Sequence, residues 1–223
     1  MANSALNPPF DPDCTRCPRL AQFLSKVREG HPDYHARPVP AFGDTSAQLI
    51  VVGLAPGMHG ANRTGRPFTG DYAGILLYRT LHKFGLASDA GSDDPDDGLR
   101  LIGCRVTNAV KCLPPQNKPE SAEVRRCNGF LAAELAAGKP WAVLALGGVA
   151  HRAVLMALGV RAREYPFRHH AAYDLPPGTK AREGVRLFSS YHCSRYNTQT
   201  KRLSAAMFEA VFGDIQKFLL SRR

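Results

Sequence analysis

Residues 48–57 read QLIVVGLAPG, and the class of fold follows from this decapeptide. An apolar, β-branched run is followed at once by glycine and proline, which predicts a buried strand that ends in a tight turn. Similar apolar runs lie at residues 101–107, 141–146 and 185–190. Segments with helical spacing of apolar residues, such as 70–85, 119–138 and 200–220, follow the strands. This alternation predicts an α/β fold, three layers (α/β/α) with a central four-stranded parallel sheet.

The chain has 223 residues, of which 44% are hydrophobic and 22% are charged. These proportions are typical of a globular protein, and the length allows one substantial core, so residues 1–223 are predicted to form a single domain. The longest apolar runs, such as Trp141–Leu146, are too short to span a bilayer. Residues 1–10 lack the basic start and apolar stretch of a signal peptide, which predicts a cytoplasmic protein.

Lysine and arginine number 29 against 19 acidic residues, which gives a net charge of +10. An excess of this size favours a polyanionic partner such as nucleic acid, although many basic proteins simply carry solvated lysines and arginines. The acidic residues gather at 92–97, whereas residues 161–186 and 195–202 are basic with interspersed aromatic side chains. We therefore expect one face to meet phosphates while the acidic loop points away from it.

Six cysteines in a chain without a secretion signal favour a metal site over disulfides. Cys14 and Cys17 are two residues apart, and Cys112 and Cys127 flank a proline-rich turn. Thiolates bind both zinc and iron–sulfur clusters, and zinc sites usually use two short knuckles where this chain has one. From spacing alone, a four-cysteine cluster, a zinc site and four unrelated thiols all stay open. Of the other two, Cys104 is predicted to be a core thiol and Cys193 is assigned no role.

The segments that follow the four strands hold most of the candidate chemistry, because ligands of open α/β sheets bind beyond the carboxyl ends of the strands. These segments are residues 53–71, 108–111, 147–151 and 191–197. The first is glycine-rich, but it lacks the Lys-Ser/Thr end of a P-loop and the spacing of a dinucleotide fingerprint. Nucleotide hydrolysis and hydride transfer therefore gain no support.

Three of these segments resemble the three motifs of the uracil-DNA glycosylase superfamily, in the same order. They are residues 53–71 (GLAPGMHGANRTGRPFTGD), 107–115 (TNAVKCLPP) and 191–200 (YHCSRYNTQT). The sequence of the first segment is similar to that of the family 5 branch. Families 4 and 5 carry a [4Fe–4S] cluster, and Cys14, Cys17, Cys112 and Cys127 fit its ligand positions. The resemblance thus implies a cluster that binds the N-terminal segment 10–30.

The resemblance also implies a base-binding site. Phe68 matches the residue that stacks on the base, and the Asn108 amide can pair with both the carbonyl and the N–H of uracil. His192 would donate a hydrogen bond to the leaving uracil, and Asp71 would stabilise the sugar cation or orient water. At the first turn of a helix, Asp71 is expected to favour its ionised form. Backbone close to the base would come from Gly53, Ala55 and Gly57. Leu54 stands where other branches place an acid or amide that positions water, so Asp71 is the substitute.

The resemblance implies cleavage of uracil, and of hypoxanthine or etheno-cytosine, from double-stranded DNA by a monomer. Residues Arg195, Tyr196 and Asn197 are expected to contact DNA, with the first two as candidates for a wedge that fills the gap left by the flipped base. Basic residues at 161–168 and 201–202 are expected to contact phosphates. Three alternatives stay open: a family 4-type enzyme restricted to uracil, a non-catalytic iron–sulfur protein that binds nucleic acid, and a zinc-stabilised hydrolase.

Overall fold

A computed structural model describes residues 10–179 and 181–222. The region predicted to lack a signal peptide therefore lies almost wholly outside the described residues. A six-stranded sheet forms the middle layer, in the order β1-β3-β2-β4-β6-β5. Its strands are β1 (Phe42–Gly43), β2 (Leu49–Gly53), β3 (Cys104–Asn108), β4 (Ala142–Leu146), β5 (Ala172–Asp174) and β6 (Arg186–Ser190).

The four central strands, β3, β2, β4 and β6, are parallel, which confirms the predicted core of the sheet. The two edge strands, β1 and β5, pair antiparallel with β3 and β6 and were not predicted. They have two and three residues, too few to show an alternating pattern. The predicted strand at 101–107 begins three residues later, because Gly103 turns the chain with a φ of 58°.

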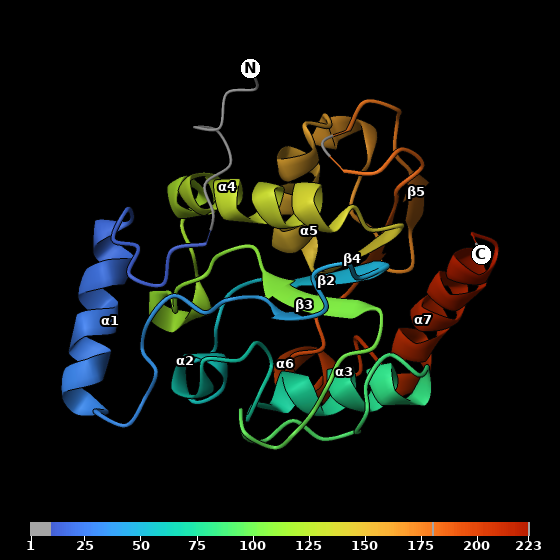
Figure 1. The fold of residues 1–223 in the computed structure, drawn as a ribbon. Coiled ribbons are helices and arrows are strands. Elements are labelled where there is room, and N and C mark those ends of the chain that lie inside the picture. Colours follow the sequence, from blue (N-terminus) through green and yellow to red (C-terminus); the bar gives the residue numbers. More distant parts are fainter. Residues whose placement is uncertain (1–9, 180, 223) are drawn as a thin grey trace.

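Helices cover both faces of the sheet (Figure 1). One face carries α1 (Pro18–Gly30), α4 (Ser121–Gly138) and α5 (Gly148–Leu158), and the other carries α3 (Tyr72–Lys83) and α7 (Ala205–Leu220). Short helices α2 (Ala61–Thr64) and α6 (Arg195–Gln199) lie in the loops, with one-turn 3-10 helices at Pro115–Asn117 and Ala162–Glu164. This arrangement confirms the three-layer fold.

Two apolar cores lie on the two faces of the sheet, because neighbouring residues of a strand point to opposite sides. In β2, Ile50 and Val52 pack in the core beneath α1, α4 and α5, whereas Leu49 and Val51 pack against α3 and α7. All five residues of β2 are buried, as a parallel strand covered on both faces requires. No helix in the described part of the chain is long and apolar enough to cross a membrane.

Helix boundaries follow local capping. Asp71 caps α3, which ends before Gly85 with its φ of 71°. Ser204 caps α7, so this helix starts later than the predicted residue 200. The helical segment predicted from residue 119 begins at Ser121, because Glu120 takes the cap position in a capping box with Glu123.

Candidate active site

A cavity of about 190 Å³ opens at the carboxyl ends of β2 and β3. It brings together four side chains that the sequence places in the site, namely Phe68, Asp71, Asn108 and His192, and the backbone of Ala55 and Gly57. The remaining lining residues are Ala61, Ala73, Asn117 and Ser194. Segments more than a hundred residues apart in the chain therefore meet at one crevice, because the carboxyl ends of parallel strands lie at the same edge of the sheet.

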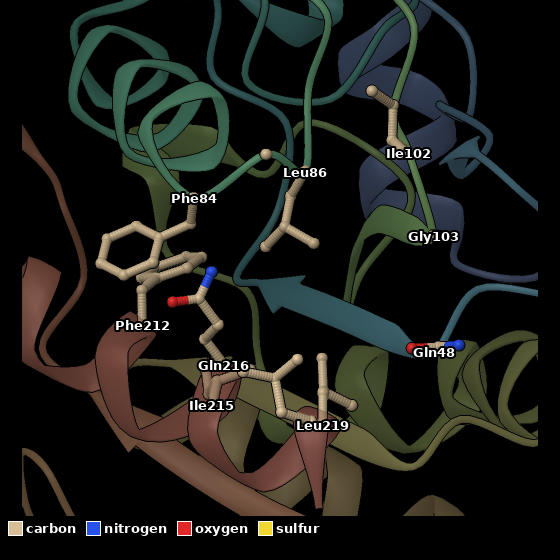
Figure 2. A pocket seen from close by; sticks show the side chains of 11 residues that line it. Gln48, Phe84, Leu86, Ile102, Gly103, Phe212, Ile215, Gln216 and Leu219 are labelled. Atoms are coloured by element: carbon tan, nitrogen blue, oxygen red, sulfur yellow. The ribbon is translucent and has the colours of Figure 1, made fainter. Parts of the chain in front are cut away.

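A second cavity, of about 260 Å³, lies at the opposite end of the sheet, where the chain enters β2 and β3 (Figure 2). Its walls come mostly from the ends of α3 and α7, and side chains such as Phe84, Leu86 and Ile215 point into it. The residues that line it include no ionisable or nucleophilic side chain. Of these two cavities, only the one at the carboxyl ends carries candidate chemistry.

Phe68 forms one wall of the candidate site. Its ring lies nearly parallel to the ring of His192, with 5.8 Å between centroids and 25° between planes. Its backbone has a φ of +56°, which is rare for a bulky residue and costs roughly 1–3 kcal/mol. The hydroxyl of Tyr78 donates a hydrogen bond of 2.7 Å to the carbonyl of Pro67, directly before it. Phe68 is therefore held in a strained conformation that aims its ring at the cavity.

Asn108 ends β3 and pairs in register with Gly53 at the end of β2. A Cβ at position 53 would collide with the Asn108 side-chain oxygen and lie 2.5 Å from the ring carbon Cζ of Phe68. Gly53 does not line the cavity but lies behind it, where the side chains of Asn108 and Phe68 pack directly against its backbone. This is the physical reason for glycine at the first position of the first motif.

Asp71 occupies the N-cap of α3, where its Oδ1 accepts a 2.8 Å hydrogen bond from the backbone N–H of Gly74. Burial raises the pKa of Asp71, and the amide hydrogen bonds from Gly74 and Ala73 only partly oppose this. The helix end thus favours the ionised form, as predicted, but burial outweighs it and the net shift of the pKa is upward. Gly60 packs so closely that a Cβ there would come 2.5 Å from Asp71 Oδ2.

His192 follows β6 and faces Phe68. Burial lowers the pKa of His192 to about 4, so the ring is neutral at physiological pH. The side chain of Asn197 donates a 2.8 Å hydrogen bond to the backbone carbonyl of His192. Asn197 thus shapes the third-motif loop, and its contact with DNA stays a prediction. Arg195 and Tyr196 are exposed, the latter by 71%.

Asn117 lines the cavity and was missed from the sequence. It lies in the loop between Cys112 and the start of α4, where Gln116 and Asn117 both have a φ of 56°. Asparagine tolerates this conformation better than most residues, and a turn was evident from Pro114 and Pro115. That the turn reaches the cavity could be known only from the tertiary structure.

Four cysteines line one pocket beside the site: Cys14, Cys17, Cys112 and Cys127. The Lys111 backbone N–H donates to the sulfur of Cys127 at 3.2 Å, and the Arg16 side chain donates to that of Cys14 at 3.3 Å. Burial raises the pKa of Cys112, and raises that of Cys127 to about 11. Within residues 10–179 and 181–222 no three cysteine, histidine or acidic side chains are grouped to hold one metal ion. Cys104 and Cys193 are fully buried elsewhere.

The sequence profile of the uracil DNA glycosylase superfamily matches residues 40–216, which include all three motifs and every lining residue of the cavity. The chain belongs to the uracil-DNA glycosylase superfamily. Membership of the uracil-DNA glycosylase superfamily makes it a DNA repair enzyme and disfavours a purely binding role or an unrelated hydrolase.

Curated relatives refine the comparison with the superfamily. The chain is 46% identical to the type-5 uracil-DNA glycosylase of Thermus thermophilus, over 92% of this chain and 93% of the relative. It is 43% identical to the type-5 enzyme of Pyrobaculum aerophilum, over 86% and 83%. The type-4 enzyme of the same archaeon is 31% identical, over 81% and 77%. Sequence identity to these type-5 enzymes is thus higher than to this type-4 enzyme, which agrees with the sequence of the first motif.

Proposed function

We propose that this glycosylase hydrolyses the N-glycosidic bond of uracil in double-stranded DNA and leaves an abasic site. The observation that carries the proposal is one cavity that combines an aromatic face, a side-chain amide, a neutral histidine and a carboxyl group. A base inside a duplex cannot reach this cavity, so the nucleotide must first flip out, which costs a few kcal/mol. The test is release of free uracil from a uracil-containing duplex.

Base recognition rests on Phe68 and Asn108. Stacking of a base on an aromatic ring contributes about 1–3 kcal/mol and does not depend on base identity. The Asn108 amide offers one acceptor and two donors, which match the N–H and a carbonyl of uracil. Together they would hold the base flat while its edge is read.

Bond cleavage breaks the bond between the sugar carbon and the base nitrogen, and the electron pair leaves with the base. Negative charge then grows on the uracil and positive charge on the sugar, so stabilisation is mainly electrostatic. Neutral His192 donates a hydrogen bond toward the departing base without adding a proton. Asp71 is the only acid among the residues that line the cavity, and it faces the sugar cation or the attacking water.

The substrate range extends, in this proposal, to hypoxanthine and etheno-cytosine. Greater likeness to the type-5 than to the type-4 relatives supports this. Cleavage assays on duplexes that carry each of these bases distinguish the wider substrate range from one restricted to uracil. Release of uracil alone would favour a type-4 specificity.

The four cysteines that line the pocket beside the site would hold a [4Fe–4S] cluster through Cys14, Cys17, Cys112 and Cys127. A four-iron cluster binds each thiolate through a different iron, so its ligands need not be grouped around one point as those of a single ion are. Two donors already directed at these sulfurs, from Arg16 and Lys111, support the fit. The cluster would supply structure, because it would tie segment 10–30 to the loop that carries Asn117. Iron and sulfide content before and after Cys17→Ser tests this.

The DNA interface would include Arg195 and Tyr196 as wedge candidates and the basic residues at 161–168 and 201–202. Tyr196 is largely exposed, and Arg195 lies 5.9 Å over the ring of exposed Tyr72. We further propose a cytoplasmic monomer of one domain. Salt dependence of duplex binding and sedimentation in solution test the interface and the oligomeric state.

A further inference from the structure

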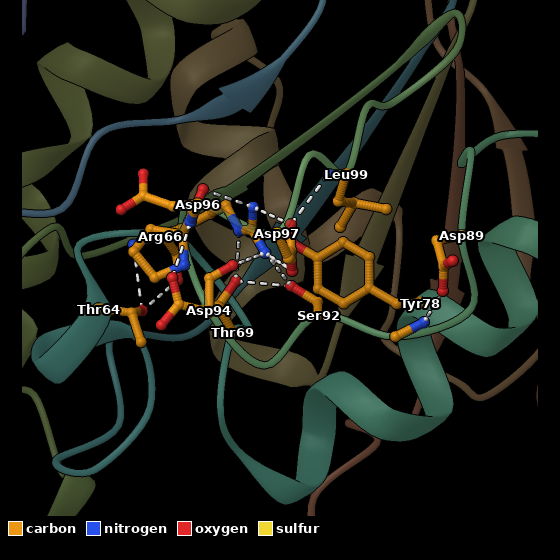
Figure 3. A network of polar contacts seen from close by, with 12 residues as sticks. Thr64, Arg66, Thr69, Tyr78, Asp89, Ser92, Asp94, Asp96, Asp97 and Leu99 are labelled. Atoms are coloured by element: carbon orange, nitrogen blue, oxygen red, sulfur yellow. Dashed lines mark hydrogen bonds and ion pairs between the residues drawn. The ribbon is translucent and has the colours of Figure 1, made fainter.

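Arg66 is almost fully buried, with 6% of its surface exposed, and it begins residues 66–70, which carry Phe68 and are called the base-binding segment. It donates hydrogen bonds along the acidic loop at residues 92–97: to Ser92 Oγ (2.9 Å), the carbonyls of Asp94 (2.6 Å) and Pro95 (3.1 Å), and both carboxylate oxygens of Asp97 (2.9 and 2.5 Å). Its Nε donates to Thr69 Oγ1 at 2.8 Å. Figure 3 shows these contacts converging on one guanidinium group.

Two further bonds join the acidic loop to the segment 66–70. The backbone N–H of Gly70 donates to the carbonyl of Ser92 at 2.8 Å, and the hydroxyls of Thr69 and Ser92 lie 2.7 Å apart. On the other side, Tyr78 holds the carbonyl of Pro67. The residues on either side of Phe68 are thus tied to the acidic loop or to α3.

Phe68 itself has the strained φ of +56°, and strain of this kind persists only where the surroundings over-determine it. The sequence indicates only an acidic loop that points away from DNA. In the structure this loop faces the base-binding segment, and Arg66 joins the two. Arg66 holds the pKa of Asp97 below its usual range, so the carboxylate is charged and both partners of the ion pair are present at neutral pH.

We propose that Arg66, Ser92 and Asp97 are positioning residues that fix the Phe68 ring opposite His192. We call these three residues the arginine clamp. The effect of the arginine clamp on catalysis rests on the proposed role of Phe68. Its effect on the position of the Phe68 ring does not depend on that role. A planar guanidinium suits this task, because its rigid fork sets direction as well as distance.

The test compares Asp97→Asn with Asp174→Asn. Both acids bind one arginine through two oxygens, and Asp174 does so with Arg186 at 2.6 Å for each bond, at the β5 edge of the sheet. Asp97→Asn is expected to lower the single-turnover rate on a uracil duplex by roughly ten- to a hundredfold, since a misplacement of about 1 Å can cost a hundredfold. Asp174→Asn is expected to leave the rate within about twofold, the spread ordinary for a surface change.

A second readout reports the position of Phe68 directly. The ring protons of His192, labelled for NMR, feel the ring current of Phe68 across the 5.8 Å stack. They are expected to shift in Asp97→Asn and not in Asp174→Asn. If Asp97→Asn does not fold, Ser92→Ala removes one Arg66 bond and the Thr69 contact while it leaves the ion pair intact, and the same shift is expected.

A double-mutant cycle with Phe68→Leu separates the two proposals. If the arginine clamp acts through Phe68, Asp97→Asn lowers the rate little or not at all in the Phe68→Leu background. Unchanged His192 resonances in the folded clamp variants would overturn the arginine clamp. So would an equal loss of rate in both backgrounds. A Phe68→Leu variant at full rate with shifted resonances in Asp97→Asn would instead refute the stacking role alone.

Discussion

Gly53→Ala adds one methyl group at the point where Asn108 and Phe68 rest on bare backbone. The new Cβ would lie 2.5 Å from Phe68 Cζ and 2.7 Å from Cε2, whereas ordinary contact begins at 3.4 Å. The ring must therefore retreat by nearly 1 Å, and the Asn108 side-chain oxygen must move as well. Both displacements move functional groups out of the positions in which they would meet the flipped base.

The expected loss of activity follows from that displacement. A misplacement of about 1 Å costs roughly a hundredfold in rate, which equals about 2.7 kcal/mol of transition-state stabilisation. Overpacking of this kind also costs about 1–3 kcal/mol of folding stability, and each kcal/mol lowers Tm by roughly 2–4 °C in a chain of this size. The protein should therefore stay folded while its chemistry slows.

Single-turnover cleavage of a uracil duplex, followed as abasic product, measures the loss of rate, and thermal unfolding measures the loss of stability. Gly213→Ala is the matched control, because Gly213 lies in α7 and a Cβ there meets nothing within 4 Å. That variant should keep the rate and gain up to about 1 kcal/mol of helix stability. A folded Gly53→Ala protein that cleaves within about threefold of the unsubstituted rate would refute the reasoning.

Three further predictions concern ionisable groups. Asp71→Asn should abolish most turnover, and unchanged turnover would remove Asp71 from the chemistry. The same substitution should raise Tm as the pH rises above the ordinary carboxyl pKa of about 4, because Asn still caps α3 while a carboxylate whose pKa is raised by burial destabilises the fold as it ionises. The folded pKa of His192, about 4, lies below its ordinary 6.5, so the unfolded chain binds more protons between these values and the free energy of unfolding should rise with pH from 4 to 6.5. His192→Gln should flatten that rise in denaturant titrations. Glu134→Gln should cost about 3–5 kcal/mol in unfolding experiments, because it leaves Lys111, 1% exposed, without its charged partner; a loss below about 1 kcal/mol would show that the pair is not desolvated.

The central sheet could be predicted because parallel strands covered on both faces must be apolar throughout, as residues 49–54 are. The convergence of Phe68, Asp71, Asn108 and His192 also followed, since each lies in a segment just beyond a strand. The edge strands β1 and β5 could not be predicted, because two or three residues carry no pattern. Asn117 was missed for another reason: its approach to the cavity depends on where the loop after Cys112 folds back.

Charge states depended on packing that the sequence does not show. The helix end at Asp71 was evident, and it does lower the pKa of the carboxyl, but the close approach of Gly60 helps to exclude solvent, and burial dominates. Arg66 was an ordinary member of a basic excess until its burial and its contacts with Asp97 were known. The net charge indicated a polyanionic partner. Only the fold distinguished a basic side chain that is exposed to DNA from one that is buried in the protein, such as Arg66.

The central claim is that Phe68, Asp71, Asn108 and His192 surround one extruded base. A crystal structure of the Asp71→Asn variant with a uracil-containing duplex tests it most directly. The account predicts the uracil ring against Phe68, its edge hydrogen-bonded to the Asn108 amide, and His192 within hydrogen-bonding distance of the base. A uracil bound outside the cavity that these residues line, or one still stacked in the duplex, would contradict it.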